Sequence, residues 1–157
     1  MIDQMRRLFL KSTIATGAFV VAAGTGLLRP TAALASWPEN AFNAKSIDTA
    51  IKDLYGTSDL TESSDVELKA PEIAENGAVV PVTVKSSLSG VSSISIIIAG
   101  NGRPMATELK LTSKSLPVFS TRVKVAKSSK IIAVVQQGDK LYSASKDVKV
   151  TVGGCGG

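Results

Sequence analysis

Hydrophobic and polar residues alternate along most of the chain after Ser58. This period of two places successive side chains on opposite faces of a strand, and Val80, Val82 and Val84 therefore share one face. The pattern recurs in short segments with no helical pattern between them, which predicts an all-β protein: an immunoglobulin-like antiparallel β-sandwich. The segments that we interpret as strands are DVELKA, VVPVTVK, ISIII, TELKL, FSTRVKV, IIAVV, KLYSAS and DVKVTV.

Turn-forming residues separate these segments. Asn76-Gly77 lies between the first two, GNGRP from Gly100 separates the third and fourth, and Gly138-Asp139 predicts a tight hairpin before KLYS. Proline has no N–H to donate to a neighbouring strand, so Pro81 predicts that its strand lies at a sheet edge.

One helix is predicted before the strands, in the segment SIDTAIKDLYG. Its apolar residues recur at helical spacing and form one face. Ser46 can cap its first turn, and Gly56 can end it in a left-handed conformation. We expect this short amphipathic helix to pack on its own domain; a membrane or partner surface is the alternative. The residues of the apolar face are Ile47, Ala50, Ile51 and Leu54.

The segment ISIII contains one apolar residue that breaks the alternation. Ile97 falls on the face opposite Ile94, Ile96 and Ile98. We therefore expect Ile97 to be exposed and to contribute to an interface with a partner protein.

Residues 1–35 have the features of an export signal. Arg6 and Arg7 precede an uncharged apolar run, and the small residues of Ala33-Leu34-Ala35 predict cleavage between Ala35 and Ser36. The paired arginines followed by LFLK resemble a twin-arginine signal, whereas Met5 is unusual there and leaves a Sec-type signal open. A retained membrane span is the other alternative. The prediction is a periplasmic protein.

Removal of the leader leaves about 120 residues, enough for one domain with its own core. The leader accounts for three of the chain's five net positive charges, so the basic character of the whole sequence is no argument for nucleic-acid binding. The sequence has no histidine, which excludes imidazole bases and histidine metal ligands. We predict a sandwich domain with its N-terminal helix over residues 36–152.

The chain ends in VTVGGCGG, with its only cysteine between glycines. Glycine weakens strand pairing and adds backbone freedom, so residues 153–157 are predicted to form a flexible arm. Five such residues have a root-mean-square reach of roughly 12 Å and a full extension of about 17 Å. Because nothing around Cys155 in the sequence can bury it, we interpret it as a functional thiol. A chance Gly-rich terminus is the alternative.

The tail resembles that of the SoxY family, the sulfur carriers of periplasmic thiosulfate oxidation. The resemblance extends through DTAIKDLYG, PEIAENGAVVPVTV, STRVKVA, IIAVV and SKDVKVTVGGCGG, in that order. It implies that the chain is a covalent sulfur carrier and not an enzyme. Cys155 is then the attachment point for sulfur intermediates, and Gly153, Gly154, Gly156 and Gly157 form a swinging arm.

The resemblance also implies the partners. A SoxY protein forms a heterodimer with SoxZ and meets the haem enzyme SoxAX, the hydrolase SoxB and, in some organisms, the sulfane dehydrogenase SoxCD. No cofactor is implied beyond the sulfur bound to Cys155. Two other classes remain open. One is a carrier activated at its terminal Gly-Gly carboxylate, and the other is a structural or assembly sandwich domain with an incidental cysteine.

Overall fold

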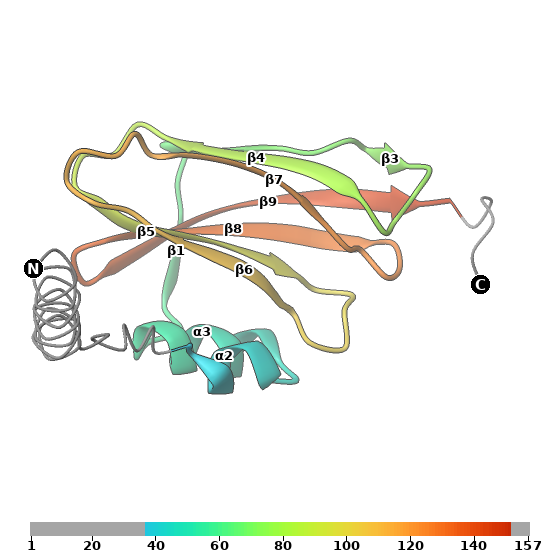
Figure 1. Ribbon diagram of the computed structural model, residues 1–157, viewed down its shortest axis with the longest axis horizontal. Helices are drawn as coiled ribbons and strands as arrows, with labels where there is room; N and C mark the ends of the chain where they lie inside the picture. Colours follow the sequence, from blue (N-terminus) through green and yellow to red (C-terminus); the bar gives the residue numbers. More distant parts are fainter. Residues whose placement is uncertain (1–36, 152–157) are drawn as a thin grey trace, which may run out of the picture. The chain divides into compact units, whose positions relative to one another are not determined.

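The computed structural model describes residues 37–151, which form two packed β-sheets and two helices (Figure 1). The larger sheet has the strand order β1-β9-β8-β5-β6, with β3 also paired to β9, and the smaller sheet has the order β2-β4-β7. Neighbours are antiparallel except that β1 and β3 run parallel to β9. The predicted β-sandwich is therefore confirmed. The elements are α2 (Glu39–Asn43), α3 (Ile47–Tyr55), β1 (Leu60–Glu62), β2 (Val66–Lys69), β3 (Ile73–Ala74), β4 (Val80–Ser86), β5 (Val91–Ile98), β6 (Met105–Lys110), β7 (Val118–Val123), β8 (Ser129–Gln137) and β9 (Lys140–Val150).

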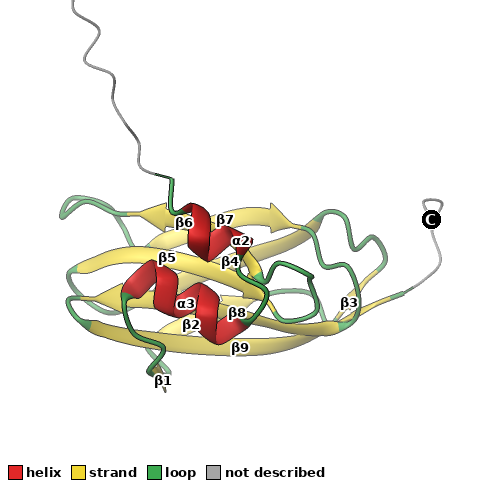
Figure 2. Cartoon of the chain, turned by 90° about the horizontal axis from the view of Figure 1, so that it is seen from below, coloured by secondary structure: helices red, strands yellow, loops and turns green. Residues whose placement is uncertain are grey.

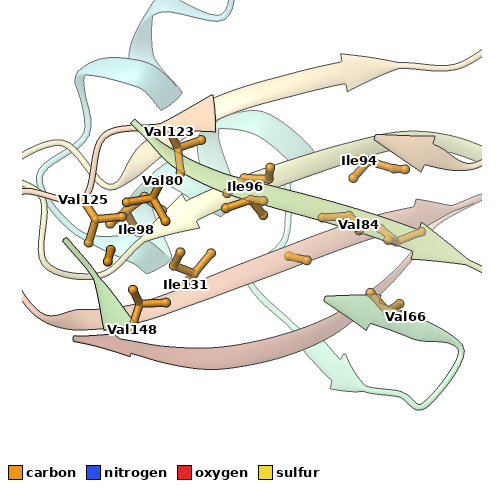
Figure 3. Close-up of a cluster of buried hydrophobic side chains, with 14 of the residues drawn as sticks. Val66, Val80, Val84, Ile94, Ile96, Ile98, Val123, Val125, Ile131 and Val148 are labelled. Atoms are coloured by element: carbon orange, nitrogen blue, oxygen red, sulfur yellow. The ribbon is translucent and has the colours of Figure 1, made fainter. Parts of the chain in front are cut away.

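The main core lies between the two sheets and consists almost entirely of aliphatic side chains (Figure 3). The alternating residues of β5 meet the alternating residues of β4 there, as the period of two requires. Full burial of one such side chain contributes about 1.5–3 kcal/mol, so this layer makes a large favourable contribution to folding. The residues from these two strands are Val80, Val82, Val84, Ile94, Ile96 and Ile98.

The two helices lie over the outer face of the larger sheet (Figure 2), and a second apolar cluster lies between them and the sheet. Ala50 and Ile51 of α3 pack there against Ile97 and Val134. Ile97 is 0% exposed, so the predicted partner interface at this residue is wrong. The helix covers the face that the strand pattern alone left open, and the helix packs on its own domain as predicted.

Both ends of α3 are fixed as the sequence predicts. The Ser46 hydroxyl oxygen accepts a hydrogen bond from the Thr49 amide at 3.1 Å, which satisfies one of the free N–H groups of the first turn. Gly56 follows the helix with φ of 80°, and its amide donates to the Lys52 carbonyl at 2.8 Å.

Several strand predictions need correction. KLYSAS and DVKVTV form one continuous strand, β9, which ends at Val150 instead of Val152. The short strands β1 and β3 have no sequence pattern that we recognised, and the helix α2 was not predicted. The rest of the boundaries predicted for the domain, including Ser36 and Val152, fall outside the described residues.

Pro81 does not mark an edge strand, because β4 is the central strand of the smaller sheet. The neighbour β2 pairs with β4 only as far as Thr83, opposite Lys69, whereas Pro81 pairs with Arg122 of β7 alone. The proline is tolerated because β2 ends before reaching it. The Gly138-Asp139 hairpin is confirmed, with Gly138 at φ of 57° and Gln137 paired to Lys140.

Candidate functional site

The residues that the sequence singles out for function lie outside the described part of the chain. The structure instead shows where the C-terminal segment begins, at the end of β9. This point is the described part of the candidate site, and we call it the arm base, defined as Val150 and Thr151. The predicted residues outside residues 37–151 are Arg6, Arg7, Ala35, Ser36, Gly153, Gly154, Cys155, Gly156 and Gly157.

Backbone pairing holds the arm base on one side. The short strand β3 runs parallel to the end of β9, with Ala74 opposite Val150. The Lys149 amide donates to the Glu72 carbonyl at 2.9 Å, and the Thr151 amide donates to the Ala74 carbonyl at 3.1 Å. The strand pairing therefore continues to the last described residue.

Ser128, in the loop before β8, holds the other side. Its hydroxyl oxygen accepts from the Val150 amide at 2.9 Å and lies 3.4 Å from the Val150 carbonyl oxygen, to which it can donate. One serine side chain thus hydrogen-bonds both the amide and the carbonyl group of Val150. This replaces the strand pairing that β8 no longer provides, because the β8–β9 register ends at Ser129 opposite Val148.

Gly77 packs directly against the arm base. A Cβ atom at this position would lie 2.5 Å from the Val125 carbonyl oxygen and 2.9 Å from Val150 Cγ1, both closer than contacts that real Cβ atoms make. The Val125 amide also donates to the Gly77 carbonyl at 2.7 Å. Only glycine allows the turn before β4, the segment after β7 and Val150 to approach this closely.

Side-chain directions at the arm base follow the pleat. Val148 is 1% exposed and Val150 packs against the main core, whereas Lys149 between them is exposed on the opposite face. The apolar side chains of Val148 and Val150 thus fix the strand end, and Lys149 is free to meet solvent or a partner.

A network of buried polar side chains lies toward the other end of the larger sheet. Tyr55 of α3 hydrogen-bonds Ser95, and Ser93 Oγ lies 3.3 Å from the Tyr55 hydroxyl and 3.2 Å from Gln136 Oε1. Burial raises the pKa of Tyr55 above its ordinary value of 10.0, and the hydrogen bonds to the two serines partly oppose this. Tyr55 is therefore a neutral phenol, and its hydrogen bonds to Ser93 and Ser95 anchor α3 to β5.

This network is too far away to act on the arm base. Gln136 pairs with Leu141 near the start of β9, and Val150 lies nine residues further along the strand. At about 3.3 Å per residue the separation is roughly 30 Å.

Within residues 37–151, no group of three or more His, Cys, Asp or Glu side chains is placed to hold a metal ion. None of the helices described is both long and apolar enough to cross a membrane.

Comparison with known proteins gives the family. The chain matches the family model for "Sulfur oxidation protein SoxY" over residues 51–155, more than half of its length. This chain belongs to the SoxY family. The match begins inside α3, includes every described strand and extends to Cys155.

A solved SoxY structure agrees with this assignment. The sulfur carrier protein SoxY from Chlorobium limicola f thiosulfatophilum is 43% identical, with a TM-score of 0.62. The alignment covers 68% of this chain and 97% of that one. A search of curated proteins found no match to this chain. The sandwich described above is therefore the SoxY fold.

Sequence reasoning missed the residues that hold the arm base. Ser128 is one polar residue in a polar loop, and its contact with Val150 spans 22 positions of the chain. β3 has two residues, too few to show a period. Asn76-Gly77 was recognised as a turn, but a turn does not reveal that its glycine contacts the last strand.

Proposed function

We propose that this chain is a covalent sulfur carrier of thiosulfate oxidation and that Cys155 bears the sulfur. Membership of the SoxY family supports a role in sulfur oxidation, and the solved SoxY relative is described as a sulfur carrier. The observation that carries the proposal is the family match that extends to Cys155, combined with an arm base that the domain holds by three separate contacts.

The chemistry needs little from the carrier itself. A thiolate is the reactive form of cysteine, and the ordinary pKa of a cysteine thiol is about 8.5. In the proposed first step, the thiolate sulfur and the sulfane sulfur of thiosulfate form an S–S bond, and two electrons pass to the haem enzyme SoxAX. The product is a cysteine S-thiosulfonate. SoxB then hydrolyses its terminal S–S bond with one water, which releases sulfate and leaves a persulfide on Cys155.

In the remaining proposed roles, too, the partner enzymes carry out the chemistry and this chain carries the sulfur. Gly153, Gly154, Gly156 and Gly157 act as a thin arm that lets partner enzymes reach the sulfur. SoxCD oxidises the persulfide sulfur where that enzyme is present. SoxZ is the proposed heterodimer partner. This assignment rests on family membership alone, because the buried Ile97 cannot contribute to an interface. The carrier needs no cofactor and is not itself a catalyst.

The proposed location is the periplasm, reached through the leader of residues 1–35. Replacement of Arg6 and Arg7 with lysine is expected to stop export if the twin-arginine route is used. Cell fractionation with an antibody to the protein measures this. Normal export of the double variant would assign the leader to the Sec route.

The direct test of the carrier role is thiosulfate turnover in a reconstituted system of the chain with SoxZ, SoxAX and SoxB. Cys155→Ser is expected to abolish turnover, because a hydroxyl cannot form the oxidised S–S bond. Its free energy of unfolding should change by less than about 0.5 kcal/mol, as for surface substitutions generally.

A relocated thiol provides the matched control. Ser89 is exposed in the turn before β5, and its side chain makes no hydrogen bond among the described residues. The Cys155→Ser/Ser89→Cys chain keeps one accessible thiol, but on the domain. We expect it to remain inactive. Turnover by this variant would mean that the position of the thiol is immaterial, which contradicts the carrier-arm proposal.

A further inference from the structure

The open side of the sandwich, between the edge strands β6 and β7, contains a cleft of about 340 Å³. Three of its nine lining residues are cationic and none is acidic. In this part of the molecule the edges of the two sheets face each other without pairing, so both leave backbone groups available to a ligand. The polar and cationic residues of the cleft are Asn101, Arg103, Thr107, Thr121, Arg122 and Lys124.

The positions of the cations follow from the strand pleat. Val123 is 6% exposed and belongs to the main core, so Arg122 and Lys124 on either side of it point away from the core. Arg103 reaches the same cleft from the turn before β6. The ion pair found within residues 37–151 joins Lys69 to Glu67 on β2, so none of the three cations forms an ion pair with a carboxylate of this part of the chain.

Asn101 fixes the geometry of the cleft. Its side-chain Nδ2 donates to the Lys124 carbonyl at 2.8 Å, and its Oδ1 accepts from the Ala126 amide at 2.9 Å. Both halves of the amide are thereby used to join the turn before β6 to the segment after β7. The backbone that carries Lys124 is held in place, which lowers the cost of ordering this residue around a ligand.

The cleft lies close to the arm base. Val150 packs against Gly77, and Gly77 accepts a hydrogen bond from the amide of Val125, the neighbour of Lys124. The segment after β7 is therefore linked to the end of β9 through Gly77, which Val125 contacts, while the adjacent Lys124 lines the cleft.

We infer that the cleft between β6 and β7 is a binding site for a tetrahedral sulfur oxyanion. Arginine side chains present paired N–H donors that match such an anion, and an added lysine charge strengthens the hydrogen bonds. The anion has two sources: free thiosulfate, or the terminal sulfonate of a thiosulfonate attached to Cys155. The choice of these sulfur anions rests on the proposed function, whereas the cationic cleft does not.

The first experiment uses the Cys155→Ser chain, so that no cargo can form, and titrates it with sodium thiosulfate at constant ionic strength. Amide NMR signals of Asn101, Thr107, Thr121 and Lys124 are expected to shift and saturate. Arg122→Gln/Lys124→Gln should weaken this binding at least tenfold. Lys69→Gln/Lys85→Gln removes the same charge from the same sheet outside the cleft and should leave the affinity within twofold.

The second experiment loads the native cysteine without any enzyme. The thiolate of Cys155 attacks an inner sulfur of tetrathionate, the central S–S bond breaks, thiosulfate leaves, and the cysteine S-thiosulfonate remains. After removal of free anions, shifts of the same cleft signals would identify the bound cargo as the ligand. Saturable binding in the first experiment without shifts in the second would identify the free oxyanion.

Two results would overturn the inference. One is the absence of saturable shifts at the cleft in both experiments, and the other is an equal loss of affinity in the two charge-matched variants. Failure of the proposed carrier function is a separate result. The first experiment measures anion binding to the Cys155→Ser chain, so its outcome does not depend on whether Cys155 carries sulfur.

Discussion

The two ends of β9 are held in different ways. Its start follows a local hairpin, in which Gly138-Asp139 turns the chain and the next residues pair back onto β8, and β1 pairs with Leu141, Tyr142 and Ser143 on the other side. Its end is fixed by residues far away in the sequence, through the Ala74 carbonyl, the close approach of Gly77 and the Ser128 hydroxyl. The start of the strand therefore has a neighbouring strand on each side, and one of the two is joined to it by a tight turn. At the end of β9 the pairing with β8 has stopped, and contacts from three separate segments take its place.

The largest expected effect concerns the tail that the end of β9 carries. Replacement of Gly154 and Gly156 with valine puts β-branched side chains on the arm, which stiffen and thicken it. If the arm must enter narrow enzyme sites, thiosulfate turnover in the reconstituted system should fall by at least tenfold. The melting temperature should stay unchanged, because the arm lies beyond the last strand.

The control for this variant is the reactivity of Cys155 toward a small thiol reagent, which should remain near that of the parent. Parental turnover by the double variant would show that the arm does not need to be thin. The glycines would then require another explanation, and only the thiol would remain essential.

The next effect tests the packing at the arm base. Gly77→Ala places a Cβ atom against the Val125 carbonyl and Val150, and such overpacking costs about 1–3 kcal/mol. Gly102→Ala is the matched control, because no atom lies within 4 Å of the added Cβ there. Urea unfolding measures both. Equal stability of the two variants would mean that Gly77 is not tightly packed.

A smaller cost is expected at the start of β9. Gly138 has φ of 57° but open space around its Cβ position, so Gly138→Ala meets a conformational penalty and no clash. The left-handed backbone costs an L-residue about 1 kcal/mol. Amide hydrogen exchange should show faster opening near the hairpin and unchanged protection at Val150. Loss of protection at Val150 would mean that the two ends are not held independently.

The smallest effect is expected for Ser128→Ala. Its hydroxyl is exposed, and water can replace it at the Val150 backbone, so the loss should be about 0.5 kcal/mol. The informative measurement is local: exchange of the Val150 amide should accelerate relative to that of Val148, which contacts the main core. Unchanged exchange at Val150 would remove Ser128 from the arm base.

The sequence predicted those parts of the fold whose patterns are local. The alternation of β4 and β5, the capped helix α3 and the Gly138-Asp139 hairpin each depend on neighbouring residues. Ile97 shows where local patterns fail. The apolar face of α3 and the extra isoleucine were both visible in the sequence, but only the tertiary structure shows that they pack together. In sequence, a strand that is covered on both faces cannot be told from a strand with one exposed apolar residue.

The candidate site divides in the same way. The tail motif with Cys155 could be predicted from the sequence because its residues are contiguous, and its role stays a prediction. The arm base could not be predicted, because the residues that hold it come from separate segments of the chain. Ala74 contributes a carbonyl oxygen, Ser128 a hydroxyl group, and Gly77 the space left by its lack of a side chain. The cationic cleft likewise combines residues from two sheets that only the fold brings together.

The most direct test of the carrier role is mass spectrometry of the protein purified from cells oxidising thiosulfate. If Cys155 carries sulfur, the peptide that contains it is expected to bear a sulfur adduct that a thiol reductant removes and that is absent from the Cys155→Ser variant. An unmodified cysteine under these conditions, or sulfur present as a thiocarboxylate on Gly157, would contradict the carrier role.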